Sequence, residues 1–181
     1  MSLLGERLLS IHAALVNAEL GHAFGGAIAL AYCTGEPRGT RDLDVNIFIP
    51  AASFKRALDA LPDEVRWDAE TARVLSEDGQ VRLWWGETPV DVFLNVHPFH
   101  NELAARVLLV PFEGQRIPVL DCTDLAVFKA LYDRTKDWAD IEEMVAANTL
   151  DASRATAELQ RLVGIDHPAL DRIERVSQRS G

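Results

Sequence analysis

The sequence predicts an α/β (α+β) protein with a mixed, largely antiparallel sheet that is flanked by helices and followed by C-terminal helices. Residues 3–20 carry apolar side chains at the spacing of an amphipathic helix. Two apolar runs, 81–85 and 90–94, are joined by a short loop with glycine and proline, a pattern typical of an antiparallel hairpin. Residues 141–178 are polar and helix-prone, and they predict two or three closing helices.

The other elements are predicted from the same periodicities and from the glycine and proline residues that interrupt them. They are a short strand at 22–24, a helix from Gly26 to about residue 32, a buried strand at 45–49, a helix at 51–61, a second hairpin formed by 107–110 and 117–120, and a helix from 124 to about 134. The loop of the first hairpin is predicted to span residues 86–89. Residues 63–80 are predicted as a polar connecting segment with a turn at Asp78-Gly79.

Length and charge limit the class of protein. A chain of 181 residues with 48% hydrophobic content can bury the core of one domain, expected at residues 1–122, with a helical region at 123–181 packed on it. The net charge of −10 argues against a broad nucleic-acid-binding surface, but it is compatible with a free nucleotide that binds with a metal ion. No apolar run approaches the ~18 residues that span a membrane, so no membrane partner is expected.

Two cysteines, Cys33 and Cys122, are present without a CxxC spacing, and the first residues do not resemble a signal peptide. The expectation is a cytoplasmic protein with two buried, reduced thiols.

Aspartates are the first candidate functional residues. Asp42 and Asp44 begin an apolar, strand-like run, and because strand side chains alternate, both point to the same face. Two neighbouring carboxylates repel each other and usually need a cation, and their hard oxygen ligands suit Mg²⁺ or Mn²⁺. Asp91 lies in the second strand of the first hairpin, and it can complete a three-carboxylate cluster if that strand lies beside the first. Divalent metals on such a cluster bind and orient a triphosphate.

A glycine pair precedes these aspartates. Gly25 and Gly26 follow a short apolar segment and open a helix-prone run. Glycine at that position lets backbone N–H groups approach a phosphate at a helix N-terminus.

The order Gly25-Gly26, Asp42-x-Asp44 and strand residue Asp91 resembles the nucleotidyltransferase superfamily, whose fold is that of DNA polymerase beta. The stretch 37–44 (PRGTRDLD) is most similar to the AbiEii-type abortive-infection toxins, and the small antibiotic nucleotidyltransferases are similar around the same residues. The resemblance covers roughly residues 20 to 147. It implies transfer of a nucleoside monophosphate from an NTP to an acceptor, with release of pyrophosphate.

The resemblance also implies roles for these residues. Asp42 and Asp44 would hold Mg²⁺ (or Mn²⁺), and Asp91 would complete the second metal position and accept the proton of the acceptor. Gly25 and Gly26 would cradle the β- and γ-phosphates.

Charged residues outside this set have two interpretations each. By resemblance to the Lys…Arg-x-Lys-Asp pattern of the abortive-infection relatives, Lys129, Lys136 and Asp137 are predicted to bind the nucleotide. The alternative is an ordinary charged helix face, with Lys136 paired to Asp140. The two lysines are seven residues apart and would share a face only on a continuous helix.

One of Arg38 and Arg41 is predicted to reach a phosphate or a substrate carboxylate, the alternative being an ion pair that relieves the repulsion of the aspartate pair. The ion pair is the favoured interpretation for Arg41, and both interpretations stay open for Arg38. At most one of Trp84 and Trp85 can line a site, because they face opposite ways. His97 and His100 are expected to be loop histidines, the alternative being a proton acceptor or a nucleotide contact.

Two functions are compatible with these features. The first is a metal-dependent nucleotidyltransferase that acts on RNA, on a protein or on a small hydroxylated molecule, and that could belong to a toxin–antitoxin system with a cognate protein partner. The second is a catalytically silent binding or regulatory protein with the same fold.

Overall fold

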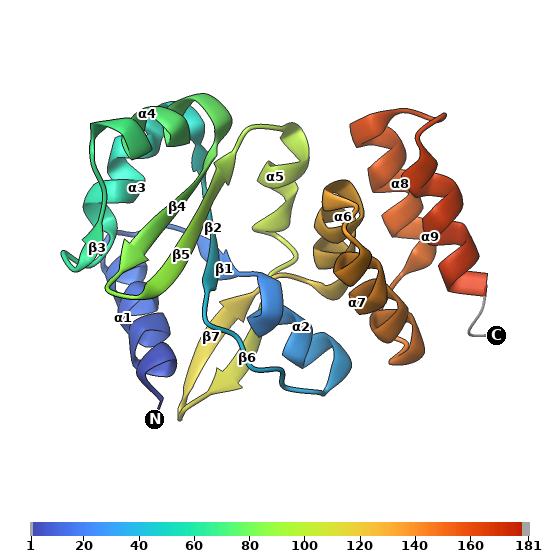
Figure 1. Cartoon of the computed structure of the whole chain (residues 1–181), viewed down its shortest axis with the longest axis horizontal. Helices are drawn as coiled ribbons and strands as arrows, with labels where there is room; N and C mark the ends of the chain where they lie inside the picture. Colours follow the sequence, from blue (N-terminus) through green and yellow to red (C-terminus); the bar gives the residue numbers. More distant parts are fainter. Residues whose placement is uncertain (1, 179–181) are drawn as a thin grey trace. The chain divides into compact units, whose positions relative to one another are not determined.

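The structure is a computed structural model that describes residues 2–178. The chain divides into two compact units, each built from two separate stretches of sequence. The sheet unit comprises the residues up to Ile28 and Gly39–Val119, and the helical unit comprises Ala29–Arg38 and the chain from Leu120 onward. In Figure 1 the seven strands belong to the sheet unit, and the orange and red helices belong to the helical unit.

Seven strands form the sheet, in the order β3-β4-β5-β2-β1-β7-β6. They are β1 (His22–Phe24), β2 (Leu43–Pro50), β3 (Val65–Arg66), β4 (Gln80–Trp85), β5 (Thr88–Asn95), β6 (Leu108–Phe112) and β7 (Gln115–Val119). Strand β2 runs parallel to β5, and β1 runs parallel to β7, whereas the other neighbouring pairs are antiparallel. The predicted mixed, largely antiparallel sheet and both predicted hairpins are therefore confirmed (Figure 1).

Helices of the sheet unit supply the rest of its core. They are α1 (Leu3–Asn17), α3 (Phe54–Ala60), α4 (Ala69–Asp78) and α5 (Pro98–Leu103), with the 3-10 helix η1 (Ala51–Ser53) before α3. Helix α1 begins after Ser2, whose hydroxyl accepts a hydrogen bond from the backbone N–H of Gly5 at 3.1 Å. Its apolar stripe, Leu8, Ile11 and Leu15, is fully buried, as the helical spacing predicts.

Side-chain alternation separates the core from the carboxylates. The inward-facing residues of the two central strands are fully buried: Leu43, Val45, Ile47, Val90 and Val92. Asp44 and Asp91 alternate with them and so lie on the other face of the sheet. Arg7 of α1 donates a hydrogen bond to Thr88, which shares the face of Val90. Helix α1 therefore covers the face opposite the carboxylates.

Residues 63–80 differ from their prediction, because they contain β3 and α4 rather than a connecting segment alone. A capping box starts α4: the Asp68 carboxylate accepts from the backbone N–H of Thr71 at 2.8 Å, and the Thr71 hydroxyl accepts from that of Asp68 at 2.8 Å. Gly79 ends the helix at φ 69°. The helix buries only Ala72 and Leu75, so its apolar periodicity is too weak to predict it.

The first hairpin has a loop of two residues, Gly86 and Glu87, because Trp85 pairs with Thr88. The predicted four-residue loop is therefore wrong. Gly86 has φ 59°, which fits the first central position of a type II′ turn. A four-residue loop would place Asp91 opposite Trp84, but the observed register places it opposite Arg82.

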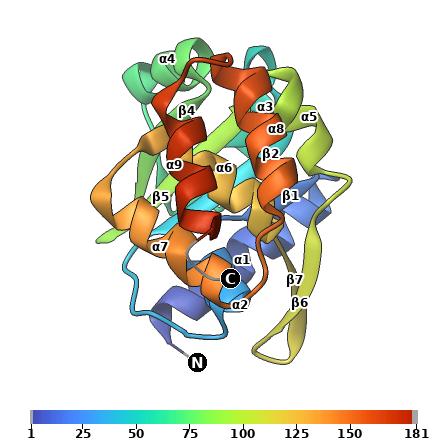
Figure 2. The same ribbon diagram turned by 90° about the vertical axis from the view of Figure 1, so that its right-hand side faces the viewer.

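The helical unit contains α6 (Cys122–Tyr132), α7 (Thr135–Ala146), α8 (Ala152–Val163) and α9 (Pro168–Gln178). It also contains the later part of α2 (Gly26–Thr34), from Ala29 onward. Helices α8 and α9 lie side by side (Figure 2), and the predicted closing helices are confirmed. None of the described helices is both long enough and apolar enough to cross a membrane.

The two cysteines contradict the predicted free thiols. Cys33 and Cys122 form a disulfide whose Cα atoms are 5.5 Å apart. Both residues are buried, with 1% and 7% of their surface exposed. The sequence did not reveal the pairing because 89 positions separate the two residues, and only the fold brings α2 and α6 together.

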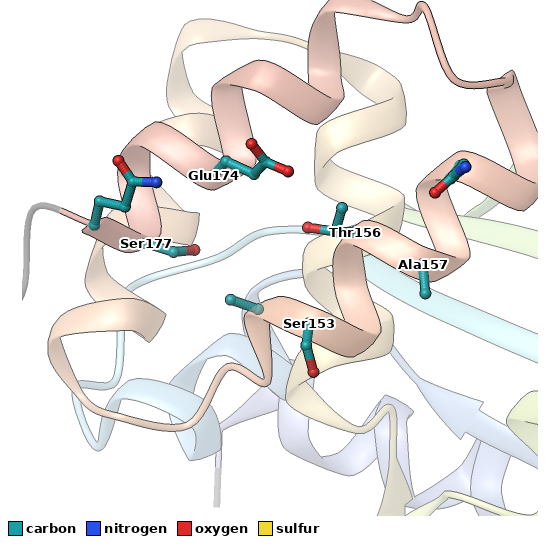
Figure 3. Close-up of a pocket in the computed structure, with 8 residues that line it drawn as sticks. Ser153, Thr156, Ala157, Glu174 and Ser177 are labelled. Carbon is teal, nitrogen blue, oxygen red and sulfur yellow. The ribbon is translucent and has the colours of Figure 1, made fainter.

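An open hollow of about 500 Å³ lies between α8 and α9 (Figure 3). It is lined by Ala152, Ser153, Thr156, Ala157, Gln160, Glu174, Ser177 and Gln178. Glu174 of α9 and Thr156 of α8 point toward the space between the helices (Figure 3). The lining carries a carboxylate and no cation, so it does not offer the charge that a triphosphate requires.

Candidate active site

Two of the predicted aspartates are direct neighbours across the sheet. Strands β2 and β5 pair in parallel, and Asp44 stands opposite Asp91 in their register. Asp42 precedes β2 and is separated from Asp44 by the buried Leu43. The condition for a carboxylate cluster, that the strand of Asp91 lies beside that of Asp44, is met.

Arg82 of β4 is the cation that pairs with these carboxylates. Its Nε donates to Oδ1 of Asp91 at 2.8 Å, and its Nη2 donates to Oδ2 of Asp91 at 2.7 Å. The same Nη2 lies 3.9 Å from Oδ2 of Asp42. The hydrogen bonding to Asp91 raises the pKa of Arg82 against the opposing effect of burial, and the charges of Asp91, Asp42 and Asp44 add to the rise. The guanidinium is therefore within electrostatic reach of all three carboxylates.

Arg82 is not among the residues predicted from the sequence, from which Arg41 is expected to relieve the aspartate repulsion. Arg41 forms no ion pair within residues 2–178, so that expectation is wrong for the described part of the chain. The signal that could have identified Arg82 is the register of the hairpin, because a two-residue loop at Gly86 places Arg82 opposite Asp91.

Asp42 is held by its own loop. The Thr40 hydroxyl donates to Oδ1 of Asp42, and the same hydroxyl lies 3.3 Å from the Asp42 carbonyl oxygen. This contact orients the carboxylate where the chain enters β2.

The glycine pair lies directly against Asp44. The backbone N–H of Gly25 donates to the Asp44 carbonyl oxygen at 2.9 Å. Gly26 begins α2 at φ 50°, and a Cβ atom at that position would approach Oδ2 of Asp44 far more closely than atoms can. The first turn of α2 and the Asp44 carboxylate therefore lie directly against each other in the sheet unit.

The donor set has the chemistry of a divalent metal site, because carboxylate oxygens are the ligands that Mg²⁺ and Mn²⁺ prefer. Across residues 2–178, however, no three carboxylate, imidazole or thiol groups are arranged to hold one ion. At this site both Asp91 oxygens accept from Arg82.

Four of the other predicted site residues belong to the helical unit, and three of them, Arg38, Lys129 and Asp137, join one network of ion pairs there. Lys129 of α6 donates to Oδ2 of Asp140 at 2.6 Å and lies 3.7 Å from Oδ1 of Asp137. Arg38 donates to Oδ1 of Asp140 at 2.6 Å and also pairs with Glu143. Arg38 therefore forms the ion pair that was one of its two predicted interpretations.

Asp137 is completely buried and accepts from Arg134 at 2.6 and 3.1 Å. Burial would raise the pKa of its carboxyl, but the hydrogen bonds from Arg134 and the charges of Lys129 and Arg134 lower it overall. These contacts give Asp137 and Lys129 a structural role in joining α6 to α7.

Lys136 differs from these residues. It is exposed and forms no ion pair in the described part of the chain. Asp133 ends α6 at φ 53° and α7 begins at Thr135, so Lys129 and Lys136 stand on separate helices and do not share a continuous face. That Arg38, Lys129, Lys136 and Asp137 bind a nucleotide stays a prediction.

His97 precedes α5 as its N-cap, whereas His100 lies within α5, so the predicted loop position is wrong for His100; both have structural contacts. Nδ1 of His97 accepts from the backbone N–H of Phe99 at 3.2 Å, which caps α5. Nδ1 of His100 accepts from the backbone N–H of Val96 at 3.0 Å, and burial lowers the pKa of His100.

Trp84 lies on the carboxylate face, since it follows Arg82 by two residues on β4, and its exposed fraction is 48%. Trp85 faces the other way, where Arg7 of α1 lies 5.6 Å from its ring centre. Only Trp84 is therefore on the side of the sheet that carries the aspartates.

Comparison with solved structures supports the fold. The solution structure of the antibiotic-resistance factor ANT(2″)-Ia is similar at a TM-score of 0.55 and 12% identity, over 97% of this chain and 90% of that one. The crystal structure of ANT(2″)-Ia in complex with adenylyl-2″-tobramycin is similar at a TM-score of 0.56 and 12% identity, over 99% of this chain and 100% of that one. No protein-family model matches the sequence, and no curated protein matches it. At this identity the comparison establishes a nucleotidyltransferase-like fold.

Proposed function

We propose that the protein is a nucleotidyltransferase that uses Mg²⁺ or Mn²⁺ to transfer a nucleoside monophosphate from an NTP to an acceptor. The observation that carries this proposal is the placement of Asp44 beside Asp91 in the parallel β2–β5 register, with Gly26 against the Asp44 carboxylate. The strand pair supplies two adjacent carboxylates as metal ligands. The helix that starts beside them supplies backbone N–H groups that can contact phosphate.

Asp42 and Asp44 would hold the metal, because they share a face and neither lies in the buried core. The metal would supply charge that offsets the negative charge of the phosphates. Asp91 would join the metal ligands and accept the proton of the acceptor hydroxyl. The first turn of α2, at Gly25 and Gly26, would offer N–H groups to the phosphate oxygens.

The acceptor is proposed as one of three classes: RNA, a protein or a small hydroxylated molecule. The ANT(2″)-Ia complex contains adenylyl-2″-tobramycin, which favours testing small hydroxylated molecules first. The AbiEii-type resemblance favours RNA or a protein, within a toxin–antitoxin system that would include a cognate partner.

The experiment is a transfer assay with each of the four labelled NTPs, Mg²⁺ or Mn²⁺, and cell extract as a source of acceptors. We expect label to appear on one class of molecule with wild-type protein and to be lost with Asp44→Ala. Asp63→Ala, which changes an aspartate outside the site in the same unit, is the matched control and should leave transfer unchanged. Transfer that persists in Asp44→Ala would contradict the proposal.

A second candidate is a catalytically silent protein that binds a nucleotide. The pairing of both Asp91 oxygens with Arg82 favours it, because the charge of the guanidinium opposes the binding of a metal ion or a proton to that carboxylate. Metal-dependent NTP binding without transfer to any fraction of the extract would support this candidate over the enzyme.

A further inference from the structure

The contact between Arg82 and Asp91 is set by the hairpin register. Strands β4 and β5 pair without a bulge, and Arg82 stands directly opposite Asp91. Both guanidinium contacts are short, at 2.8 and 2.7 Å, and each uses a different carboxylate oxygen. This bidentate (two-pronged) geometry is the strongest arrangement available to an arginine and a carboxylate.

The same guanidinium also lies near the proposed metal ligands. Its Nη2 is 3.9 Å from Oδ2 of Asp42, and Asp44 is the strand neighbour of Asp91. Arg82 is thus a positive charge among three negative ones. The Arg82 side chain is 51% exposed, whereas that of Asp91 is 16% exposed, so the arginine has room to turn away while Asp91 stays in place.

We infer that Arg82 competes with the divalent cation for Asp91, so that Asp91 joins the metal ligands only when the guanidinium releases it. The inference rests on the proposed metal site at Asp42 and Asp44 and adds to it a residue that sets how tightly the metal binds. The lone pairs of Asp91 that face the guanidinium are not available to a metal ion while the contact lasts, and the positive charge of Arg82 repels the cation, so the contact weakens metal binding.

The opposite role, in which Arg82 holds Asp91 ready for the metal, predicts the opposite result. If Arg82 competes, its removal tightens metal binding. If Arg82 only positions Asp91, its removal weakens metal binding or leaves it unchanged.

The test is a titration of the full-length protein with Mn²⁺, in which free Mn²⁺ is followed by electron paramagnetic resonance. Arg82→Gln removes the charge and the two-pronged contact, and we expect its apparent dissociation constant for Mn²⁺ to fall about fivefold or more. Arg66→Gln is the matched control. Arg66 is an exposed arginine on β3, opposite Trp84, and it has no ion pair within the described residues.

Removal of either arginine changes the net charge equally, so Arg66→Gln measures the general electrostatic effect. We expect it to shift the Mn²⁺ dissociation constant less than about twofold, because Arg66 is exposed to solvent and forms no ion pair with the aspartates within the described residues. An equal effect of the two variants, or weaker binding by Arg82→Gln, would overturn the inference.

Dependence on Asp91 is tested by a double-mutant cycle. In an Asp91→Asn background, Arg82→Gln should no longer tighten Mn²⁺ binding, because the contested carboxylate is gone. Tightening that persists there would show that the effect does not pass through Asp91. Arg82→Lys keeps the charge but loses the two-pronged contact, and it should change affinity in the same direction as Arg82→Gln, so the test does not depend on one variant folding.

The same titration separates the inference from the proposed function. Absence of Mn²⁺ binding in the wild type and every variant, or binding that is unaffected by Asp44→Asn, would overturn both. Binding that requires Asp44 but does not tighten in Arg82→Gln would overturn the inference alone.

Discussion

A Cβ atom placed on Gly26 would lie 1.9 Å from Oδ2 of Asp44 and 2.6 Å from its Cγ. Such distances are well inside van der Waals contact, and Gly26 also has φ 50°, a conformation that side-chain-bearing residues rarely adopt. The glycine therefore allows the helix start and the carboxylate to approach each other more closely than any other residue would.

Gly26→Ala should lose Mn²⁺ binding and nucleotidyl transfer, because the new methyl group must displace the Asp44 carboxylate. We expect the free energy of unfolding to fall by about 1–3 kcal/mol from backbone strain alone. The control is Gly39→Ala, since a Cβ atom at Gly39 would meet nothing within 4 Å. Wild-type Mn²⁺ affinity in Gly26→Ala would show that the Asp44 position is not critical.

Lys136 and Lys129 should respond differently to replacement by alanine. Lys129→Ala leaves the buried Asp137 and Asp140 without a partner on α6, and removal of one partner from a buried ion pair costs about 3 kcal/mol. Lys136→Ala should change the free energy of unfolding by less than about 0.5 kcal/mol, because the side chain is exposed. Chemical denaturation of both variants measures this contrast.

Lys136→Ala is therefore the clean test of the predicted nucleotide contact. If Lys136 binds a phosphate, the dissociation constant for the metal–NTP complex measured by calorimetry should rise about tenfold. An unchanged dissociation constant would assign Lys136 to the solvent-exposed face of α7.

Reduction of the Cys33–Cys122 disulfide should destabilise the protein. A cross-link between residues 89 positions apart restricts the unfolded chain, and such bonds typically contribute 2–4 kcal/mol. We expect a reducing agent to lower the midpoint of urea denaturation in the wild type and to have no effect on the Cys33→Ala/Cys122→Ala protein. Two reactive thiols in the unreduced, denatured wild type would show that the bond does not form.

The histidine pair of the sheet unit should make stability depend on pH. His12 Nδ1 lies 2.8 Å from His22 Nε2, and His22 Nδ1 must donate to the Leu20 carbonyl oxygen at 2.9 Å. Burial lowers the pKa of both imidazoles, and the charge of His12 further lowers that of His22. Because the folded pKa values lie below the ordinary histidine pKa of 6.5, the unfolded chain binds more protons in acid.

Stability contributed by the pair is therefore complete above about pH 6.5 and is lost as the pH falls through the lowered folded values. Thermal unfolding followed by circular dichroism from about pH 7.5 down to pH 5 should show this loss. His12→Gln, whose amide can still donate to His22, should flatten the dependence, whereas His167→Gln in the helical unit should leave it unchanged. A dependence that is as steep in His12→Gln as in the wild type would exclude the pair as its source.

The strands and the carboxylates were predictable because strong local patterns define them. Asp44 and Asp91 alternate with residues that are fully buried in the core, such as Val45 and Val92, and that alternation identifies both the strand and the face. Helix α4 was not predicted because it buries only two residues, which is too few to give a clear apolar periodicity. Asp68 and Thr71, which form its capping box, were the sequence signal for its start.

The role of Arg82 could not be predicted because it depends on a register. A hairpin loop predicted two residues too long shifts every cross-strand neighbour and hides the partner of Asp91. The disulfide and the contact of Lys129 with Asp140 depend on tertiary packing, which local sequence patterns do not contain.

The helical unit is assembled from two stretches that the ribosome makes at different times. Residues 29–38 are translated before the whole of Gly39–Val119, and their partners begin only at Leu120. At typical rates of synthesis, Cys33 waits on the order of 10 s for Cys122 to be made. During that interval Leu30 and Cys33, which are buried in the finished unit, lack the helices that follow Leu120.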